Sequence, residues 1–456
     1  MASNSFSLKP IDVKKVNTKF RKIQTKIPVP ESIPLFKQLF NLETRAMHGQ
    51  IPLIWEKAKD FSIYDKWGNK WIDFTSTIFV ANAGHANKRI LDGLKNLLDK
   101  PLLHTYTYLS LERLDYLKYL IENTPAQFEK AFLLSAGTET TEVALKLMRM
   151  NGQKIAKEKV GIICLQGAYH GRTMGAQFMN GPSSERNWIA YEDPNIHHIQ
   201  FPYPWIVENP EEFFENEISV LLKKKGLNAR KHLSGFMLET YQGWGAVFYP
   251  KEFIKALEKF AKENSMLIAF DEMQAGFGRT GKLFGYQHYD VEPDILCCGK
   301  GASSGPPLSI VLGSSELMDL PNIGSMSSTH SANPISCVAG LENMKALLED
   351  GLIRQASLLG DIFHQELNCI RQKYSNHLKY ISGKGLVAAL IFLDESNNPL
   401  SKLCDKISEL AFQRGLLVVH TGRESIKLAP PLSISKEALL EGLEVLDNAI
   451  GDAISI

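Results

Sequence analysis

The stretch Met266-Leu-Ile-Ala-Phe-Asp-Glu272 places an uninterrupted apolar run directly before two acids. A short apolar run bounded by polar residues is typical of a strand that is buried on both faces. Five similar runs occur along the chain, at Ala131–Leu134, Val160–Leu165, Gly235–Leu238, Ile295–Cys298 and Ser309–Leu312. Helical spacing lies between them, as at 139–150 and 251–264, and this alternation predicts βαβ units on a mostly parallel sheet.

The regions around these runs suggest how the chain is divided. The 456 residues are enough for one large enzyme with appended lobes. We expect an amino-terminal arm at 1–60, a large domain at 61–344 and a smaller carboxyl-terminal domain at 345–456. In the smaller domain the pattern predicts helices at 350–373, 400–414 and 435–450, and strands at 385–392 and 416–420.

Composition excludes several classes of protein. With 51 Lys and Arg against 50 Asp and Glu, the net charge is +1, so no global field favours nucleic acid or an anionic membrane as partner. The six cysteines have neither CxxC spacing nor a Cys/His metal pattern, which favours a reducing compartment and predicts no metal site. No apolar run approaches the roughly 20 residues of a membrane span, and no secretory signal is evident. We expect a cytoplasmic protein.

The first 30 residues break this charge balance. They carry seven Lys and Arg against the single acid Asp12. Such a segment could be an organelle leader, a nucleic-acid arm, or an arm that lies on its own protein or on a partner subunit. We favour the last interpretation because the segment continues into a Pro-punctuated apolar stretch, Ile27 to Phe40, rather than ending at a cleavage site.

Residues that can carry chemistry follow the predicted strands. Ligands of open α/β sheets lie beyond the carboxyl ends of the strands. Ser135-Ala-Gly-Thr138 precedes a helix whose first amides could hold a phosphate, and Tyr169 would bring an aromatic ring. Asp271 ends the central run, and Lys300 stands between glycines after Ile295–Cys298. Each feature also has a simpler interpretation when it is taken singly. Ser135–Thr138 would be a helix cap, Tyr169 a packing residue and Lys300 a lysine in a solvated turn. No Walker A motif precedes Lys300, so nucleotide hydrolysis is disfavoured.

Taken together, these residues meet the needs of one cofactor. Pyridoxal phosphate (PLP) requires a lysine for its aldehyde, an acid beside its ring nitrogen, an aromatic face for stacking and a cup for its phosphate. The sequence offers all four, each after a different predicted strand.

Five ordered motifs resemble those of the class III aminotransferases, which are PLP enzymes of fold type I. They are Ser135–Glu139, Tyr169–Thr173, Asp271–Gly281, Lys300 and Thr329–Pro334, and the resemblance runs from about residue 45 to the end. It implies an α/β fold with a mostly parallel seven-stranded sheet and a smaller α+β carboxyl-terminal domain. It also implies transfer of an amino group from an amino-acid donor to a ketone, aldehyde or keto-acid acceptor by a ping-pong mechanism.

The resemblance assigns roles to individual residues. It implies that Lys300 is the Schiff-base lysine and proton shuttle, and that Asp271 pairs with the pyridinium nitrogen. It further implies that Gln274 contacts the ring hydroxyl and that Tyr169 stacks on the ring. The backbone of Gly137 and Thr138 would bind the phosphate. Glu239 matches the first acid of a tract that is shared within the family. Thr329 would reach the phosphate of the neighbouring subunit, which implies a homodimer with shared active sites.

Two positions depart from relatives that use glutamate. Trp244 stands where many of them carry a second Glu, and Lys427 stands where they place an arginine. A lysine offers a point charge in place of a planar fork. We hypothesise an atypical substrate, such as a cyclic one, with Trp244 as a flat apolar wall and Lys427 meeting a carboxylate. The alternative is that Trp244 packs at the rim and another residue binds the acid.

Two other functions stay open at this point. Amino-acid racemases and epimerases of the same family look similar around Asn333–Gly340. The absence of the Glu and the Arg at positions 244 and 427 fits them as well. A non-catalytic binding protein on the same scaffold is disfavoured by the intact Lys300 and Asp271.

Overall fold

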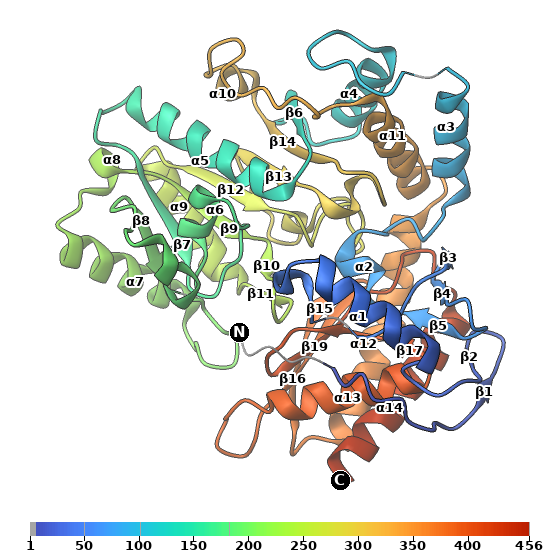
Figure 1. Cartoon of the computed structure of the whole chain (residues 1–456). Helices are drawn as coiled ribbons and strands as arrows, with labels where there is room; N and C mark the ends of the chain where they lie inside the picture. Colours follow the sequence, from blue (N-terminus) through green and yellow to red (C-terminus); the bar gives the residue numbers. More distant parts are fainter. Residues whose placement is uncertain (1–5, 50, 101, 182, 456) are drawn as a thin grey trace. The chain divides into compact units, whose positions relative to one another are not determined.

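The structure is a computed structural model that describes residues 6–49, 51–100, 102–181 and 183–455. The chain forms two compact units (Figure 1). Unit 1 comprises Met1–Asn87, Trp244–Ala246 and Leu352–Ile456, and unit 2 comprises Lys88–Gly243 and Val247–Gly351.

Unit 2 is built on a seven-stranded sheet in the order β6-β14-β13-β12-β9-β7-β8. The strands are β6 (Lys130–Leu134), β7 (Gly161–Leu165), β8 (Ile196–Ile199), β9 (Leu233–Glu239), β12 (Leu267–Asp271), β13 (Ile295–Cys298) and β14 (Ser309–Gly313). All neighbours are parallel except β14, which runs antiparallel to both β13 and β6. The six predicted strands and the mostly parallel sheet are therefore confirmed. The edge strand β8 was not predicted, because its Ile-His-His-Ile sequence lacks a continuous apolar run.

Helices cover both faces of this sheet. On one face, α5 (Gly137–Gln153) packs its buried Val143, Leu147 and Met148 into a core cluster with alternate residues of the strands, such as Ile162 and Met237. Phe236, next to Met237, points to the opposite face. There its ring lies 6.2 Å from that of Phe214 on α7 (Pro210–Lys225) and 6.3 Å from that of Phe260 on α9 (Lys251–Glu263).

The remaining elements of unit 2 connect and flank these layers. They are α3 (Lys88–Leu98), α4 (Leu111–Glu122), α6 (Met174–Met179), η3 (Ser183–Ile189), α8 (Ala229–His232), β10 (Tyr241–Gln242), β11 (Val247–Phe248), η4 (Gly285–His288), η5 (Lys300–Ala302), α10 (Ser315–Met318) and α11 (Pro334–Leu348).

Unit 1 contains two antiparallel-rich sheets and their helices. One sheet has the order β1-β2-β5-β4-β3, with β17 beside β5, and the other has the order β15-β16-β19-β18. Their strands are β1 (Val16–Asn17), β2 (Lys22–Ile23), β3 (Lys57–Lys59), β4 (Ser62–Tyr64), β5 (Lys70–Asp73), β15 (Leu378–Lys384), β16 (Val387–Phe392), β17 (Leu416–Leu417), β18 (Val419–His420) and β19 (Ser425–Leu428). The helices are η1 (Pro30–Ser32), α1 (Ile33–Leu42), η2 (Arg45–Met47), α2 (Ser76–Phe79), α12 (Leu352–Lys373), α13 (Ser401–Gln413) and α14 (Lys436–Ser455).

Residues 61–87 group with the carboxyl-terminal part of the chain, although we expected them in the large domain. The physical reason is that β5 pairs in parallel with β17, and that the buried Trp71 stacks on Phe412 with ring centroids 5.7 Å apart. The indole of Trp71 also donates to the carbonyl of Phe412 at 2.9 Å. Unit 2, in turn, continues to Gly351 rather than ending at 344.

The described part of the basic amino-terminal segment packs within unit 1. Ile23, Ile27 and Val29 are buried in a cluster that also contains Trp71. Arg21 pairs with Glu441 through its Nε at 2.6 Å and donates from Nη1 to the carbonyl of Arg414 at 2.7 Å. These described residues therefore lie against other parts of unit 1.

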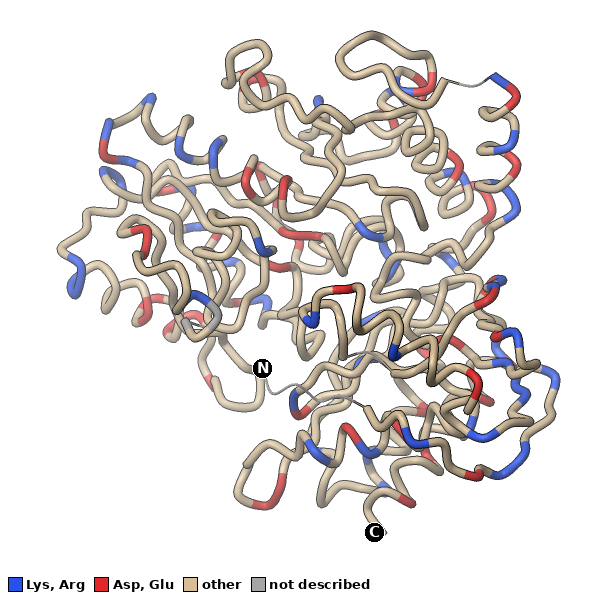
Figure 2. Tube along the Cα trace, in the orientation of Figure 1, with Lys and Arg blue, Asp and Glu red and all other residues tan. Residues whose placement is uncertain are grey.

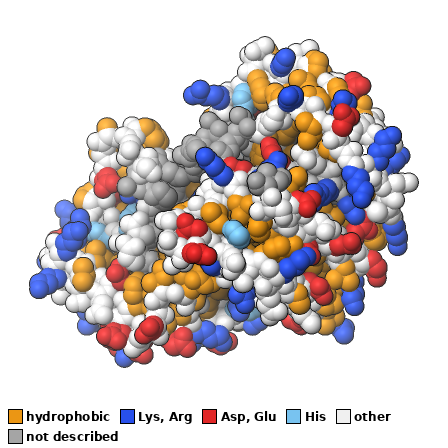
Figure 3. Space-filling model, turned by 90° about the horizontal axis from the view of Figure 1, so that it is seen from below, with side chains coloured by type: hydrophobic (Ala, Val, Ile, Leu, Met, Phe, Trp, Pro, Cys, Tyr) orange, Lys and Arg blue, Asp and Glu red, His pale blue; other side chains and the backbone are white. Residues whose placement is uncertain are grey.

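Basic and acidic residues are interspersed in both units (Figure 2), and one face shows both signs among hydrophobic side chains (Figure 3). This mixing agrees with the net charge of +1. Within the described residues, no helix is both long enough and apolar enough to cross a membrane.

A buried lysine joins the amino ends of three neighbouring strands in unit 2. Lys159 precedes β7, is 0% exposed, and donates from Nζ to the carbonyls of Arg230, Leu233 and Asn264 at 3.0, 2.6 and 2.9 Å. Lys159→Met would leave these carbonyls without that donor. We expect a loss of about 4 kcal/mol in the free energy of unfolding, measured with urea.

The matched control is Lys154→Met. Lys154 is 45% exposed, and its Nζ lies 3.3 Å from the carboxylate of the exposed Glu316. We expect a change below about 0.5 kcal/mol for this variant. Equal effects of the two substitutions would contradict the structural role of Lys159.

Candidate active site

The pocket lies at one edge of the seven-stranded sheet. Asp271 is in register with Glu239 and with Cys297, so β9, β12 and β13 end side by side. Because β14 is antiparallel to both β13 and β6, the carboxyl end of β6 reaches the same edge. A cavity of about 300 Å³ opens here, within the size range of small-molecule sites.

The cavity brings together seven of the predicted site residues, all from unit 2: Gly137, Thr138, Tyr169, Glu239, Asp271, Gln274 and Lys300. The other lining residues are His170, Gly171, Arg172, Thr240, Tyr241, Met273 and Ala275. Thr329, Trp244 and Lys427 are not among the residues that line it.

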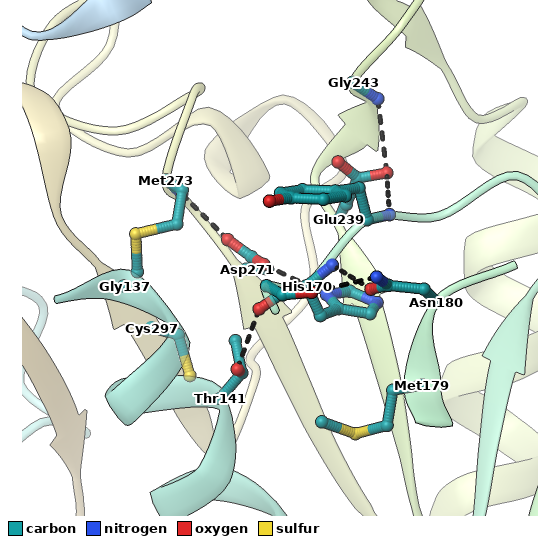
Figure 4. Close-up of polar contacts among 12 residues, drawn as sticks. Gly137, Thr141, His170, Met179, Asn180, Glu239, Gly243, Asp271, Met273 and Cys297 are labelled. Carbon is teal, nitrogen blue, oxygen red and sulfur yellow. Dashed lines mark hydrogen bonds and ion pairs between the residues drawn. The ribbon is translucent and has the colours of Figure 1, made fainter. Parts of the chain in front are cut away.

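Asp271 is a buried carboxylate that meets a histidine (Figure 4). Its Oδ1 accepts from the backbone N–H of Met273 at 3.0 Å, and its Oδ2 lies 3.0 Å from Nδ1 of His170. An ionised carboxylate can only accept, so Nδ1 carries the proton. The cost of burying this acid is therefore offset by a histidine and a backbone amide.

His170 is itself fixed on several sides (Figure 4). Its backbone N–H donates to Oδ1 of Asn180 at 2.6 Å, and its carbonyl accepts from the hydroxyl of Thr141 at 2.9 Å. Its Nε2 is buried and has no hydrogen-bond partner among the described residues. Sequence reasoning did not assign His170 a role. Its position directly after Tyr169 in a strand-end motif was the available signal.

Lys300 follows β13 in an unusual backbone conformation. Its φ of 43° lies in the left-handed region, which costs a non-glycine residue about 1–3 kcal/mol. Burial lowers the pKa of the Lys300 ammonium, while the charges of Asp271 and Glu239 act in the opposite direction. A lysine with a lowered pKa is a better nucleophile and proton carrier at neutral pH.

Glu239 ends β9 and is also buried. Its Oε2 accepts from the backbone N–H groups of Gly243 and Tyr169 at 3.2 and 3.3 Å. Burial nevertheless raises the pKa of this carboxyl to about 7, with opposing contributions from His170 and the two amides.

The α5 end of the pocket presents free backbone. Glu139 accepts from the N–H groups of Ser135 and Ala136, both at 2.8 Å. The next two amides, of Gly137 and Thr138, belong to the first helical turn and have no carbonyl partner within the helix. Together with the positive end of the helix dipole they form a suitable anion site.

The remaining predicted contacts take up three different positions. Tyr169 is 40% exposed, and the guanidinium of Arg172 lies 5.5 Å from its ring centroid. The backbone carbonyl of Gln274 accepts from the hydroxyl of Tyr241 at 2.9 Å. Thr329 is exposed, and its carbonyl lies 2.7 Å from Nε2 of His104.

Trp244 and Lys427 both belong to unit 1. The carbonyl of Trp244 accepts from the hydroxyl of Ser425 at 2.9 Å, two residues before Lys427 on β19. The guanidinium of Arg423 lies 4.2 Å from the Trp244 ring centroid, a contact that sequence reasoning missed. Lys427 is 6% exposed, with Nζ 4.7 Å from the ring centroid of Phe79.

The raised pKa of Glu239 makes stability depend on pH. Since the folded state holds an extra proton between pH 4.5 and about 7, its stability falls as the pH rises through this range. We expect Glu239→Gln to match the cofactor-free parent near pH 4.5 and to exceed it by roughly 3 kcal/mol at pH 8. Urea unfolding at a series of pH values measures this difference.

The exposed Glu215 on α7 provides the control, since Glu215→Gln removes a solvated carboxylate. We expect its effect on the free energy of unfolding to be nearly the same at every pH. A pH-independent difference for Glu239→Gln would contradict the raised pKa.

Comparison with known proteins identifies the family of this chain. The sequence model of the family "Aminotransferase class-III" matches residues 44–450. The chain is 31% identical to the ornithine aminotransferase of Brevibacillus brevis, covering 85% of this chain and 91% of that protein. It is also 28% identical to the alanine/serine racemase of Pyrococcus horikoshii, covering 99% and 97%.

A solved structure extends this similarity to three dimensions. The (S)-enantioselective omega-transaminase of Thermomicrobium roseum superimposes with a TM-score of 0.79 at 26% identity, covering 92% of this chain and 94% of that one. The family match covers most of the sequence, and the seven-stranded sheet with a pocket at its carboxyl edge is consistent with that family. The chain belongs to the class III aminotransferases, PLP-dependent enzymes of fold type I.

Proposed function

We propose that this enzyme moves an amino group from an amino-acid donor to a ketone, aldehyde or keto-acid acceptor by a ping-pong mechanism. The observation that supports this most strongly is the pocket shared by Lys300 and Asp271, each at the end of a neighbouring strand. Transfer of ¹⁵N from a labelled donor to a panel of carbonyl acceptors, followed by mass spectrometry, tests the proposal. Absence of label in every acceptor would contradict it.

The pocket residues fit PLP. A side chain at Gly137 would place its Cβ 2.6 Å from the sulfur of Met273, and one at Gly171 would place it 2.3 Å from the hydroxyl of Thr138. The glycines therefore allow Met273 to pack closely against Gly137, and Thr138 against Gly171, where the pocket meets the predicted phosphate site. The pocket also supplies an amine and a buried carboxylate, the two groups that the aldehyde and the ring nitrogen require.

Each residue then has a defined task. When bound, PLP supplies an aldehyde that condenses with amines and a ring that withdraws electrons. Lys300 would hold the cofactor through Nζ and, once displaced by the donor, carry a proton to and from the substrate carbon. Asp271, oriented by His170, would keep a proton on the ring nitrogen.

The other lining residues would orient the cofactor. Tyr169 would stack on the ring, and Gln274 would contact its hydroxyl. Glu239 would lie beside them at the end of β9, while the amides of Gly137 and Thr138 would bind the phosphate.

Racemisation or epimerisation is the second candidate. The specific observation in its favour is the similarity to the Pyrococcus horikoshii racemase over almost the whole chain. A racemase would incorporate solvent deuterium at Cα with inversion and without any keto acid, whereas an aminotransferase requires the acceptor for net turnover.

Substrate selection is proposed to depend on Trp244 and Lys427. Arg423 covers one face of the indole, so Trp244 offers at most its other face as an apolar wall for a cyclic substrate. Lys427 would meet the carboxylate as a point charge. It would therefore bind the carboxylate with less geometric specificity than the planar guanidinium of an arginine.

Two substitutions test this selection. We expect Trp244→Glu and Lys427→Arg, singly and together, to shift the kcat/KM ratio of glutamate to an apolar amino donor about tenfold toward glutamate. Trp188→Glu changes an exposed tryptophan outside the pocket and should leave the ratio unaltered. An unchanged donor preference in both site variants would contradict the proposed role of Trp244 and Lys427 in substrate selection.

We also propose a homodimer in which Thr329 serves the neighbouring active site. Large apolar side chains are exposed around the start of α4, at Leu98, Leu102, Leu103, Tyr106, Tyr108, Leu109, Leu111 and Leu114. Such a patch favours a protein partner. His104 and Tyr106 from the same segment contact Thr329 and Ser327, at 2.7 and 3.1 Å. Sedimentation of the PLP-loaded enzyme as a monomer would contradict the proposal.

A cytoplasmic location is proposed as well. All six cysteines are free, and five of them are buried, which is compatible with a reducing compartment. Fractionation of the cells that produce the protein would test this location.

A further inference from the structure

The backbone around Lys300 is held in a conformation that a lysine does not adopt by preference. Lys300 and Ser304 both have positive φ values, of 43° and 54°. Left-handed backbone at non-glycine residues persists only where the surroundings impose it. Within the turn itself, the N–H of Ala302 donates to the carbonyl of Gly299 at 2.9 Å. This hydrogen bond does not use the carbonyls of Gly301 and Ala302, which accept from a side chain outside the turn.

The side chain that holds them is Asn343 on α11. It is 0% exposed, and its Nδ2 lies 2.9 Å from the carbonyl of Gly301 and 2.9 Å from the carbonyl of Ala302. Its Oδ1 accepts from the hydroxyl of Ser304 at 2.6 Å. One buried amide thus contacts three of the four residues that follow Lys300.

The orientation of this amide follows from its partners. Backbone carbonyls can only accept, so the Asn343 atom that faces both of them must be the NH₂ group, which has two protons to give. The carbonyl of the amide then faces Ser304, whose hydroxyl can donate. The three hydrogen bonds are mutually consistent, and buried networks of this kind restrict conformation strongly.

We propose that Asn343 is a positioning residue for Lys300, holding the turn after the lysine so that Nζ stays directed at the reacting carbon. This inference rests on the proposed role of Lys300. Loss of the amide would leave two buried carbonyls without their donor, and the turn would relax toward the ordinary right-handed or extended backbone. The Cα–Cβ bond of Lys300 would then point in a different direction, which would displace Nζ. The residues that bind the substrate would be unchanged.

The test compares Asn343→Leu, which keeps the size of the side chain, with Lys159→Met. Lys159 is also a fully buried donor to backbone carbonyls, but it lies at the amino edge of the same sheet. One readout is the rate at which cofactor-free protein captures PLP on Lys300, trapped by hydride reduction and measured by peptide mass spectrometry. The second is the change in kcat compared with that in donor KM.

We expect Asn343→Leu to slow both capture and kcat by roughly 10–100-fold, with less than about threefold change in donor KM. Lys159→Met should lower the melting temperature while capture and kcat stay within about threefold of the parent. Ser304→Ala, which removes only the hydroxyl that orients the amide, should change the same two readouts in the same direction by a smaller factor.

The proposal is overturned if Asn343→Leu captures PLP and turns over like the parent, or if Lys159→Met is slowed as much. Should Asn343→Leu not fold, the Ser304→Ala result decides, and a parent-like capture rate would overturn the proposal. A failure of the proposed role of Lys300 is distinguishable, since it would appear as PLP capture on another residue in the unaltered protein. A failure of the proposed amino transfer would appear separately, as absence of ¹⁵N label in every acceptor while PLP is captured on Lys300.

Discussion

Lys300→Ala is expected to lower kcat by roughly 10⁴-fold or more, because it removes both the amine that holds the cofactor and the proton carrier. The remaining pocket residues include no second lysine. Hydride reduction of the PLP-loaded protein should fix the cofactor mass on the peptide that contains residue 300 in the parent and leave that peptide unlabelled in the variant.

Two controls make this result specific. Lys300→Arg keeps a cation at the position but cannot supply a free amine, since a guanidinium stays protonated. It should therefore be as inactive as the alanine variant. Lys282→Ala removes an exposed lysine whose Nζ donates to the carbonyl of Gln287 at 2.8 Å, and it should retain parent activity. Lasting activity in Lys300→Ala, or labelling of another lysine, would show that a different residue holds the cofactor.

The second large effect is expected for Asp271→Asn. The substitution preserves the size of the side chain and removes the negative charge that would keep the ring nitrogen protonated. We expect kcat to fall by roughly 10²–10³-fold, the usual size for loss of one electrostatic contact at a reacting centre. Single-turnover measurement of proton removal from Cα-deuterated donor separates this loss from slow product release.

The adjacent acid provides a matched control. Glu272 is equally buried, and it accepts from the Thr240 hydroxyl at 2.5 Å and from the N–H groups of Gly285 and Tyr286 at 2.8 and 2.7 Å. It does not line the pocket, so Glu272→Gln should affect stability rather than kcat. Comparable losses of kcat in the two variants would mean that Asp271 acts through the fold and not on the cofactor.

Much of the large unit could be predicted from local pattern. Strand β13 begins and ends where the apolar run Ile295–Cys298 does, and α9 differs from its predicted range by one residue. These elements are fully determined by burial on both faces or by strong helical periodicity. Strand β8 was missed because its alternating His residues carry little hydrophobic signal.

The grouping of residues 61–87 could not be predicted from local pattern. Strand β5 finds its parallel partner β17 more than 300 residues later in the chain, at Leu416–Leu417. Nothing in a four-residue strand encodes so distant a partner. The choice depends on which apolar surfaces meet, as when Trp71 stacks on Phe412.

By itself, the sequence showed which residue types stand at the strand ends, and from them it predicted PLP as the cofactor and Lys300 and Asp271 as its binding residues. Chemistry of that kind is local, since a lysine or an acid directly after an apolar run must emerge at the edge of the sheet. Only the tertiary structure decided what surrounds these groups: His170 against Asp271, Asn343 beneath the Lys300 turn, and Arg423 on Trp244. Each of these contacts joins elements that are distant in the chain or separated by a loop, and its geometry depends on how the elements pack rather than on the residues next to it.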